Sequence, residues 1–197
     1  MNVVKTRKPA AERKEQIVDE AMRLAAELGP DRMTTQKLAD AVGVSQAAIF
    51  RHFSNKTEIW QAVASRIGSA MPAKIIESDE PPMDRLRAIV KRQFEFIVKT
   101  PSIPAILYSR ELHAENEVLR QRFAEMINRR QALFAGLFRD AVAAKQIRDD
   151  IDPEDAARLV LSYIQGMAMR WSMEEHGFDI VADGVRIMEL QLKGYQA

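Results

Sequence analysis

Residues 29–60, with the sequence GPDRMTTQKLADAVGVSQAAIFRHFSNKTEIW, predict two short helices joined by a tight turn. Thr34 is a suitable N-cap for the first helix. Gly43 can adopt the left-handed conformation that a sharp turn after this helix requires. Ser45 is a suitable N-cap for the second helix. Two short helices joined by a turn that contains glycine are typical of a helix-turn-helix, here over about residues 34–53.

The second of these helices, expected from Gln46 to about His52, carries side chains that suit the major groove of DNA. The amide of Gln46 can pair with adenine and the guanidinium of Arg51 with guanine. Ala47 is small enough to let the helix backbone approach the groove closely. Four further residues suit phosphate groups: Thr34, Thr35, His52 and Lys56. Short helix pairs are common, so a small packing unit that does not bind DNA is the alternative interpretation.

Helical periodicity extends over the rest of the chain, and no stretch shows sustained strand alternation. The sequence therefore predicts an all-α fold. Beyond the helix-turn-helix, we expect helices over Ala10–Leu28, from Lys56 onward, and over Asp84–Lys99, Ile103–His113, Glu117–Ala144, Pro153–Glu174 and Phe178–Lys193. Prolines and acidic residues between Met71 and Pro82 mark a break. We place an N-terminal domain, of three-helix helix-turn-helix type, at residues 10–66 and a larger helical domain at 67–197.

The last two expected helices each have one narrow polar stripe and are otherwise apolar. An ordinary surface helix buries about a third of its circumference. These two helices need packing partners on two sides, and a second copy of the chain is the simplest provider. The expected homodimer interface comprises Leu159, Tyr163, Gly166, Met188 and Leu192. The alternative is a large core within one protomer.

The composition restricts the class of protein. With 197 residues, 47% of them hydrophobic and 29% charged, the chain is a globular protein and not a disordered one. It has no cysteine, which excludes disulfides, a thiol nucleophile and a zinc finger. Its apolar runs are far shorter than a membrane span, and its N-terminus lacks the apolar segment of a signal peptide. We therefore expect a cytoplasmic protein with no membrane partner.

The charge is unevenly distributed along the chain. The formal net charge is only +1, but residues 1–14 contain five basic residues and one acidic residue. A basic arm on an otherwise balanced chain indicates an anionic partner at that end. A solubilising tail is the alternative.

The run from Gly29 to Trp60 resembles the DNA-binding region of the TetR/AcrR family of transcriptional regulators. The matching pieces are Thr34-Thr35 with Leu38-Ala39, Ala41-Val-Gly-Val-Ser45, and Phe50-Arg-His-Phe53 followed by Lys56. The resemblance extends over about residues 10–66. Ala47 stands where the family often has glycine, and Phe50 stands where it often has tyrosine. Without the tyrosine hydroxyl, Phe50 lacks one hydrogen bond to phosphate that the family often makes.

The resemblance implies a ligand-responsive repressor. Such a dimer binds a palindromic operator in double-stranded DNA and leaves it when a small-molecule effector enters the C-terminal domain. The resemblance puts Gln46, Ala47, Phe50, Arg51 and His52 on the recognition helix and Thr34, Thr35 and Lys56 at the DNA backbone. The basic arm, Lys5 to Lys8, would add a salt-sensitive contact.

An effector pocket between helices should be apolar with a few polar groups. The apolar and aromatic candidates are Phe94, Ile97, Tyr108, Met126, Phe134, Met167 and Trp171, and the polar ones are His113, Arg110 and Arg170. We expect an apolar or aromatic effector. For each candidate, a place in the ordinary core is the alternative interpretation.

An enzyme is less well supported. His113 has several glutamates nearby, but only Glu117, at i+4, shares its helix face. The sequence contains no nucleophile elbow, P-loop or paired-histidine metal motif. We therefore expect no catalytic residues, no metal and no cofactor. Two further interpretations stay open. One is a DNA-binding protein controlled without a small ligand, whose C-terminal core would be filled, and the second is an interaction module that binds no DNA.

Overall fold

The structure is a computed structural model that describes residues 9–70 and 79–196. Over these residues it consists of helices and contains no strand, so the all-α prediction is confirmed. The helices are α1 (Ala10–Leu28), α2 (Thr35–Val42), α3 (Gln46–Phe50), α4 (Lys56–Ala70), α5 (Pro82–Lys99), α6 (Ser102–Leu107), α7 (Arg110–Ala114), α8 (Glu117–Ala143), α9 (Pro153–Met173) and α10 (Ile180–Lys193).

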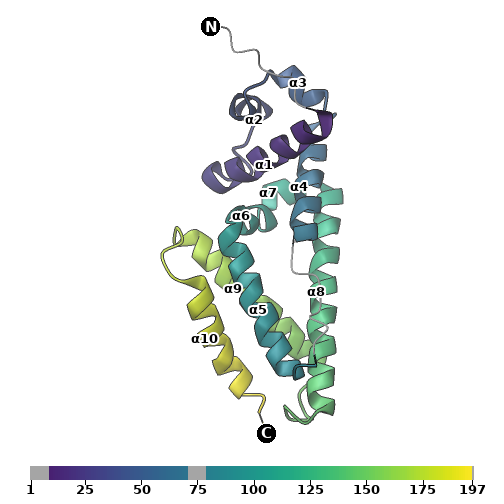
Figure 1. The fold of residues 1–197 in the computed structure, drawn as a ribbon, viewed down its shortest axis with the longest axis vertical. Helices are drawn as coiled ribbons and strands as arrows, with labels where there is room; N and C mark the ends of the chain where they lie inside the picture. Colours follow the sequence, from purple (N-terminus) through teal and green to yellow (C-terminus); the bar gives the residue numbers. More distant parts are fainter. Residues whose placement is uncertain (1–8, 71–78, 197) are drawn as a thin grey trace.

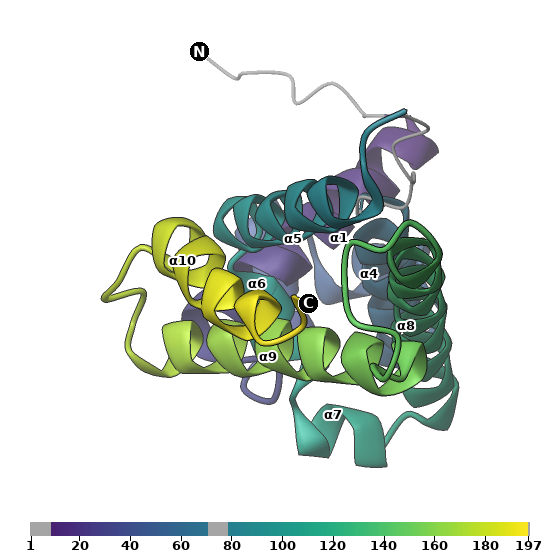
Figure 2. The ribbon, with the colours of Figure 1, turned by 90° about the horizontal axis from the view of Figure 1, so that it is seen from below.

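The molecule is elongated, with helices α1 to α4 at one end and α5, α8, α9 and α10 at the other (Figure 1). Helix α8 connects the two halves, because it contacts α4 on one side and α5 and α9 farther along. Its 27 residues span about 40 Å at the usual rise per residue. Viewed along the long axis, α9 and α10 lie side by side at one edge of the bundle (Figure 2).

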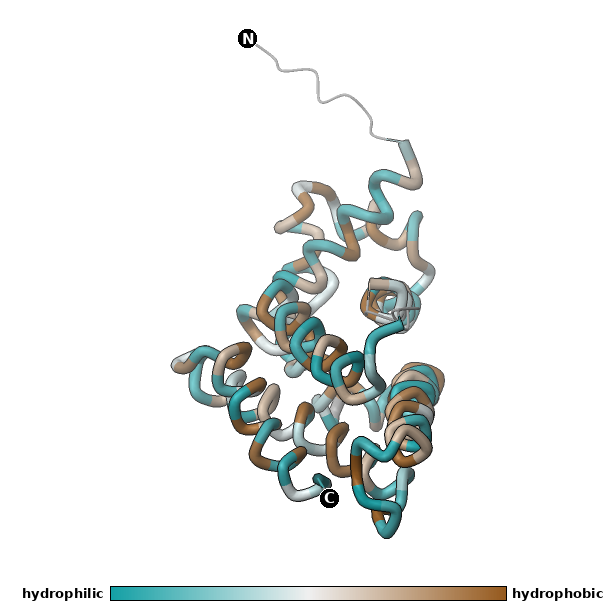
Figure 3. The backbone as a smooth tube through the Cα atoms, turned by 60° about the horizontal axis from the view of Figure 1, so that its bottom comes forward, coloured by the Kyte–Doolittle hydropathy of each residue, from teal (hydrophilic) through white to brown (hydrophobic). Residues whose placement is uncertain are grey.

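The buried apolar side chains form two clusters. Every helix mixes hydrophobic and hydrophilic residues, as an amphipathic bundle requires (Figure 3). One cluster joins α1 to α4 with residues of α6, α7 and the start of α8, among them Ile103, Ile106 and Phe123. The other cluster joins α5, the rest of α8, α9 and α10. The packing therefore does not follow chain order, because α6 and α7 pack on the N-terminal helices.

The helix expected over Ile103–His113 is wrong, since two helices, α6 and α7, occupy this range. The physical reason is Ser109, which lies between them. Its hydroxyl accepts a hydrogen bond from the backbone N–H of Leu112 at 3.1 Å and donates one to Asp31 at 2.7 Å. A hydroxyl that caps the next helix in this way ends the previous one. The chain beyond Met71 thus has six helices in its described part, where the sequence predicted five.

Most of the other helix boundaries agree with the sequence prediction. Helix α1 ends as expected at Gly29, whose φ of 83° favours glycine. Helix α10 begins two residues later than expected, because Asp179 caps it by accepting hydrogen bonds from the backbone N–H groups of Val181 and Ala182. Among the described residues, no helix is both long enough and apolar enough to cross a membrane.

Candidate DNA-binding site and C-terminal pocket

The predicted helix-turn-helix is formed by α2 and α3. The Thr34 hydroxyl accepts a hydrogen bond from the backbone N–H of Lys37, and the Ser45 hydroxyl accepts one from that of Ala48. Between the helices, Gly43 adopts φ 73° and ψ 41°, the left-handed conformation. This conformation costs a residue with a side chain about 1–2 kcal/mol. The two caps and the glycine turn predicted from the sequence are therefore confirmed.

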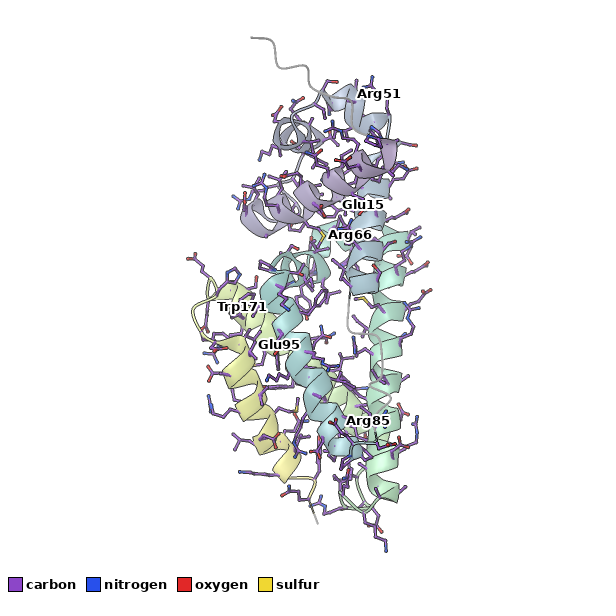
Figure 4. The ribbon with its side chains drawn as sticks, in the orientation of Figure 1. Glu15, Arg51, Arg66, Arg85, Glu95 and Trp171 are labelled. Atoms are coloured by element: carbon purple, nitrogen blue, oxygen red, sulfur yellow. The ribbon has the colours of Figure 1, made fainter. Side chains whose placement is uncertain are left out.

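Helix α3 is held in place by its buried face. Ile49 is fully buried and Phe53 is nearly so, and both pack in the cluster that includes α1. Helix α4 is tied to α1 by Arg66, which forms ion pairs with Glu15 and Asp19. Figure 4 shows this pair of helices with Glu15 and Arg66 close together. The scaffold fixes α3 rigidly, and its other face remains exposed.

The exposed face of α3 carries the residues expected to contact bases. Gln46, Ala47 and Arg51 are exposed, and Phe50 is 42% exposed although it is aromatic. The Gln46 amide donates a hydrogen bond to the Thr35 hydroxyl at 2.5 Å. Arg51 lies at the free end of the molecule, opposite the C-terminal helices (Figure 4). The structure thus brings the expected groove-facing residues onto one accessible surface.

The residues expected to contact phosphates differ in how far they are exposed. Thr34 is exposed, whereas Thr35 and His52 are half-buried. Lys56 begins α4, as expected, but is half-buried in a polar cleft that Asp31 and Glu115 also line. The sequence did not indicate that acidic residues line the same cleft as Lys56.

The basic arm, Lys5 to Lys8, lies outside the described residues. The first basic residues that the structure describes are Arg13 and Lys14 of α1. The Lys14 ammonium lies 5.4 Å from the centre of the Phe53 ring, within the range of a cation–π contact. A basic group therefore lies close to the end of α3.

A small pocket of about 40 Å³ lies between α5, α6, α8 and α9. Three of the predicted pocket residues line it: Ile97, Tyr108 and Met126. Its lining also includes residues of both hydrophobic clusters. Ile103 belongs to the N-terminal cluster, and Leu161 and Ile164 belong to the C-terminal one. The pocket therefore lies at the boundary between the two cores.

The other predicted pocket residues lie elsewhere. Phe94 and Phe134 are fully buried in the C-terminal core, Trp171 is buried there with its indole N–H donating to the Phe178 carbonyl, and Met167 packs against the same core. The helical period shows that these side chains face inward. It does not show which neighbouring helix they meet, and that decides between core and pocket.

The polar candidates are also placed away from the pocket. A ring nitrogen of His113 makes a 2.9 Å hydrogen bond with the Leu107 carbonyl, and its ring meets the Phe123 ring edge-on. Arg170 is exposed and pairs with Glu174, and Arg110 is exposed. These residues lie in helices, as predicted, but they do not line the pocket between the two cores. Within the described part of the chain, no three histidine or carboxylate residues are grouped so as to hold a metal.

Three polar pocket residues were missed, and two of them are buried, Gln93 of α5 and Arg130 of α8; the third is Gln165 of α9. Gln93 and Arg130 are only 6% and 8% exposed. A signal existed in the sequence, because Arg130 occupies a position of the apolar stripe of its helix, between Ile127 and Phe134. A charged residue on a buried stripe is rarely there for packing alone. Burial lowers the pKa of Arg130, and it raises the pKa of Tyr108, whose hydroxyl is 3.4 Å from the Gln165 carbonyl.

The predicted interface residues divide into two groups. Leu159 is 56% exposed, and Gly166 is exposed with open space where a Cβ would stand. Tyr163 is half-buried and donates a 2.7 Å hydrogen bond to the Gly184 carbonyl. Met188 and Leu192 are buried in the protomer's own core, so their side chains are not available to a partner. The helical period alone could not separate the inner face of α10 from its outer face.

Three further exposed apolar residues lie on the outer face of α9 and α10 and were not predicted from the sequence. They are Met169 and Met173 on α9, at 42% and 75% exposed, and Leu190 on α10, at 63%. Together with Leu159 and Gly166, the two methionines form a stripe at spacings of three, four and seven residues along α9. An apolar stripe with this spacing is typical of a helix that packs against another helix.

Comparison with known proteins agrees with this geometry. The family described as "Bacterial regulatory proteins, tetR family" matches residues 17–63, and the family described as "Tetracyclin repressor-like, C-terminal domain" matches residues 79–174. The nucleoid occlusion factor SlmA of Mannheimia succiniciproducens is 29% identical over 163 residues, which cover 81% of this chain and 76% of that protein.

Solved structures share the whole fold. NalD, the secondary repressor of a multidrug efflux pump in Pseudomonas aeruginosa, superposes with a TM-score of 0.75 at 18% identity, covering 95% of this chain and 98% of its own. The complex of SmeT, from Stenotrophomonas maltophilia, with triclosan has a TM-score of 0.74 at 22% identity, covering 94% and 92%. The two matching families, the helix-turn-helix and the shared fold agree, and the chain belongs to the TetR family of DNA-binding transcriptional regulators.

Proposed function

We propose that this protein is a ligand-responsive repressor that binds a palindromic operator as a homodimer and is released by a small molecule. The observation that carries this proposal is the position of the pocket at the boundary between the two hydrophobic cores. An occupant of this pocket touches helices of both halves of the molecule at once. It can therefore bind one arrangement of the two halves better than another, which is what a ligand needs to shift an equilibrium.

Helix α6 is the element that would transmit this effect. Its residues Ile103 and Leu107 line the pocket, while the helix packs against α1 of the DNA-binding half. The hydrogen bond from Ser109, just after α6, to Asp31, just after α1, ties α6 further to the DNA-binding half at 2.7 Å. A ligand that pushes α6 outward would tilt α1 and the helix-turn-helix that rests on it. Two heads held by one dimer would then no longer match half-sites at a fixed spacing.

On the DNA, Gln46, Ala47 and Arg51 would lie in the major groove and Thr34, Thr35, His52 and Lys56 along the phosphates. Phe50 would lie against the groove wall without the hydrogen bond that a tyrosine provides. The dimer would form through the exposed stripe of α9, with Leu190 of α10 beside it. The outer faces of α9 and α10 of two protomers would then bury each other, as the isologous contact of a two-fold dimer requires.

The first experiment is selection of bound sequences from a random DNA pool, followed by the salt dependence of binding to the selected sequence. We expect a palindromic sequence, bound at least about a thousandfold more tightly than bulk DNA. Binding without any selected sequence, lost as salt rises, would contradict a sequence-specific repressor. Generic phosphate contacts alone produce that result.

Replacing Arg51 with alanine should reduce discrimination between the preferred base pair and its alternatives at one operator position by about 1–3 kcal/mol. The loss arises because a bidentate contact to guanine disappears while the phosphate contacts stay. The measurement is the affinity for the selected operator and for single-base variants of it. Arg120→Ala is the matched control, since Arg120 is exposed on α8 and paired with Glu117. An equal loss on every DNA sequence would identify Arg51 as a phosphate contact instead.

A second candidate is a DNA-binding protein that no small molecule controls. The observation in its favour is the name of the relatives at 28–29% identity, nucleoid occlusion factor. This candidate requires binding to the selected DNA that no pocket ligand changes. The position of the pocket between the two cores, with Arg130 buried in its lining, favours the ligand-responsive repressor.

A further inference from the structure

Arg130 is a buried charge that forms no ion pair within the described part of the chain. Only 8% of the residue is exposed, and its Nη1 atom is buried without a hydrogen-bond partner among the described residues. A guanidinium remains protonated under all ordinary conditions. Burying a charge without a partner is strongly unfavourable, so buried charges are nearly always paired.

The surroundings of Arg130 make this position unusual within its own helix. The other arginines of α8 are exposed, and three of them form ion pairs with carboxylates: Arg120 with Glu117, Arg129 with Glu125 and Arg139 with Glu154. The pocket that Arg130 lines includes no acidic residue. Nine of its thirteen lining residues are apolar, and the other three polar ones, Gln93, Tyr108 and Gln165, are neutral. The pocket thus combines an apolar wall with one net positive charge.

We infer that the pocket binds a monocarboxylic acid with an apolar body, whose carboxylate pairs with the guanidinium of Arg130. This inference rests on the proposed function and names its effector class. A carboxylate accepts two parallel N–H bonds from a guanidinium, and such charge-assisted bonds are about twice as strong as neutral ones. A phosphate group, with a charge near −2 at pH 7, would leave one negative charge uncompensated in this apolar site.

Gln93 places a second polar group in the pocket. Its side-chain oxygen is buried without a hydrogen-bond partner within the described residues, and the residue is 6% exposed. It faces the same pocket as Arg130, from α5 across the space to α8. The unpartnered oxygen of Gln93 is an acceptor and cannot bond a carboxylate, so only the amide N–H₂ of Gln93 can donate to one. Recognition of the carboxylate therefore rests on the guanidinium of Arg130.

The first test uses decanoate and decan-1-ol, which differ in the charged end and share the apolar chain. Thermal unfolding of the full-length dimer and release of the selected operator are followed as each compound is added below its micelle concentration. We expect decanoate to act at a concentration at least tenfold lower than decan-1-ol in both measurements. A second pair, 2-naphthoate and 2-naphthylmethanol, repeats the comparison with an aromatic body.

The second test replaces Arg130 with methionine, which keeps an unbranched side chain without the charge. Without ligand, the melting temperature should rise by about 2–4 °C, since an unpaired buried charge is removed. The tenfold preference for decanoate over decan-1-ol should disappear. Arg129→Met is the matched control. The Arg129 side chain is 73% exposed, and its guanidinium lies 3.8 Å from the Glu125 carboxylate, so its charge is neither buried nor unpaired. This variant should leave both the melting temperature and the preference unchanged.

The outcomes separate this inference from the proposed function. If the alcohols release the operator as well as the acids do, the repressor is ligand-responsive and the assignment of a carboxylate is overturned. If the acids stabilise the protein through Arg130 but leave the operator bound, the assignment stands and the proposed repressor mechanism fails. If neither acid stabilises the wild-type protein and Arg130→Met does not raise the melting temperature, the pocket binds no such acid.

Discussion

Replacing both Leu159 and Met169 with glutamate should convert the dimer into monomers and weaken binding to a palindromic operator by at least about a hundredfold. The two side chains are 56% and 42% exposed in the protomer, so the folded chain tolerates a charge at either place. In the proposed dimer they face the second copy. Each substitution then places two carboxylates in an apolar interface, and burying a charge without a partner costs several kcal/mol.

The loss of operator affinity follows from the loss of the second contact. A dimer bound through one half-site presents its second DNA-binding domain at a high effective concentration, which a monomer cannot do. The measurements are the molar mass in solution, by light scattering or sedimentation, and the affinity for the selected operator. Circular dichroism checks that the helical content is unchanged, because the claim concerns assembly and not folding.

Two control variants make this test specific. Val118→Glu places the same charge on an apolar residue of α8 that is 47% exposed and lies outside the stripe, and it should leave the dimer intact. Met188→Glu places the charge in the protomer's own core, where the residue is 2% exposed, and it should unfold the chain. An unchanged molar mass for the double variant would rule out the α9 stripe as the interface.

The helices and their ends could be predicted from the sequence because their signals are local. A cap at Thr34, a glycine at the turn and the spacing of apolar residues all act within a few positions. The one clear error, the helix over 103–113, has a local cause and a distant one. The Ser109 hydroxyl caps the next helix through the N–H of Leu112, and it also donates a hydrogen bond to Asp31, 78 positions earlier in the chain. A contact between segments so far apart leaves no local signal.

In the candidate sites, too, features set by local sequence were predicted, whereas features set by contacts between distant helices were not. The accessible face of α3 was predicted because its exposed and buried residues alternate with the helical period. Of the residues predicted for an effector pocket, Ile97, Tyr108 and Met126 line the cavity between the two cores, and the assignment of an effector to it stays a prediction. An inward-facing residue such as Phe94 enters the core or a cavity according to which helix lies opposite. That depends on the packing of four helices together and not on any one of them.

Replacing Gly184 with alanine should destabilise the protein by about 3 kcal/mol, against the preference of helices for alanine. That preference alone would stabilise α10 by about 1 kcal/mol. The structure opposes it, because a Cβ on Gly184 would lie 2.5 Å from the ring of Phe94, which is fully buried. Such overpacking forces the ring or the helix to move, and the hydrogen bond from Tyr163 to the Gly184 carbonyl would then be lost as well.

Two glycines compared under the same conditions test this packing most sharply. Gly68 lies in α4 with nothing within 4 Å of the position of a Cβ, so Gly68→Ala should follow helix preference and stabilise the protein by up to about 1 kcal/mol. Urea unfolding of both variants at one protein concentration measures the difference. Opposite signs would show that α10 packs directly on Phe94. A stabilising effect of both substitutions would mean that α10 lies farther from α5 than the structure places it.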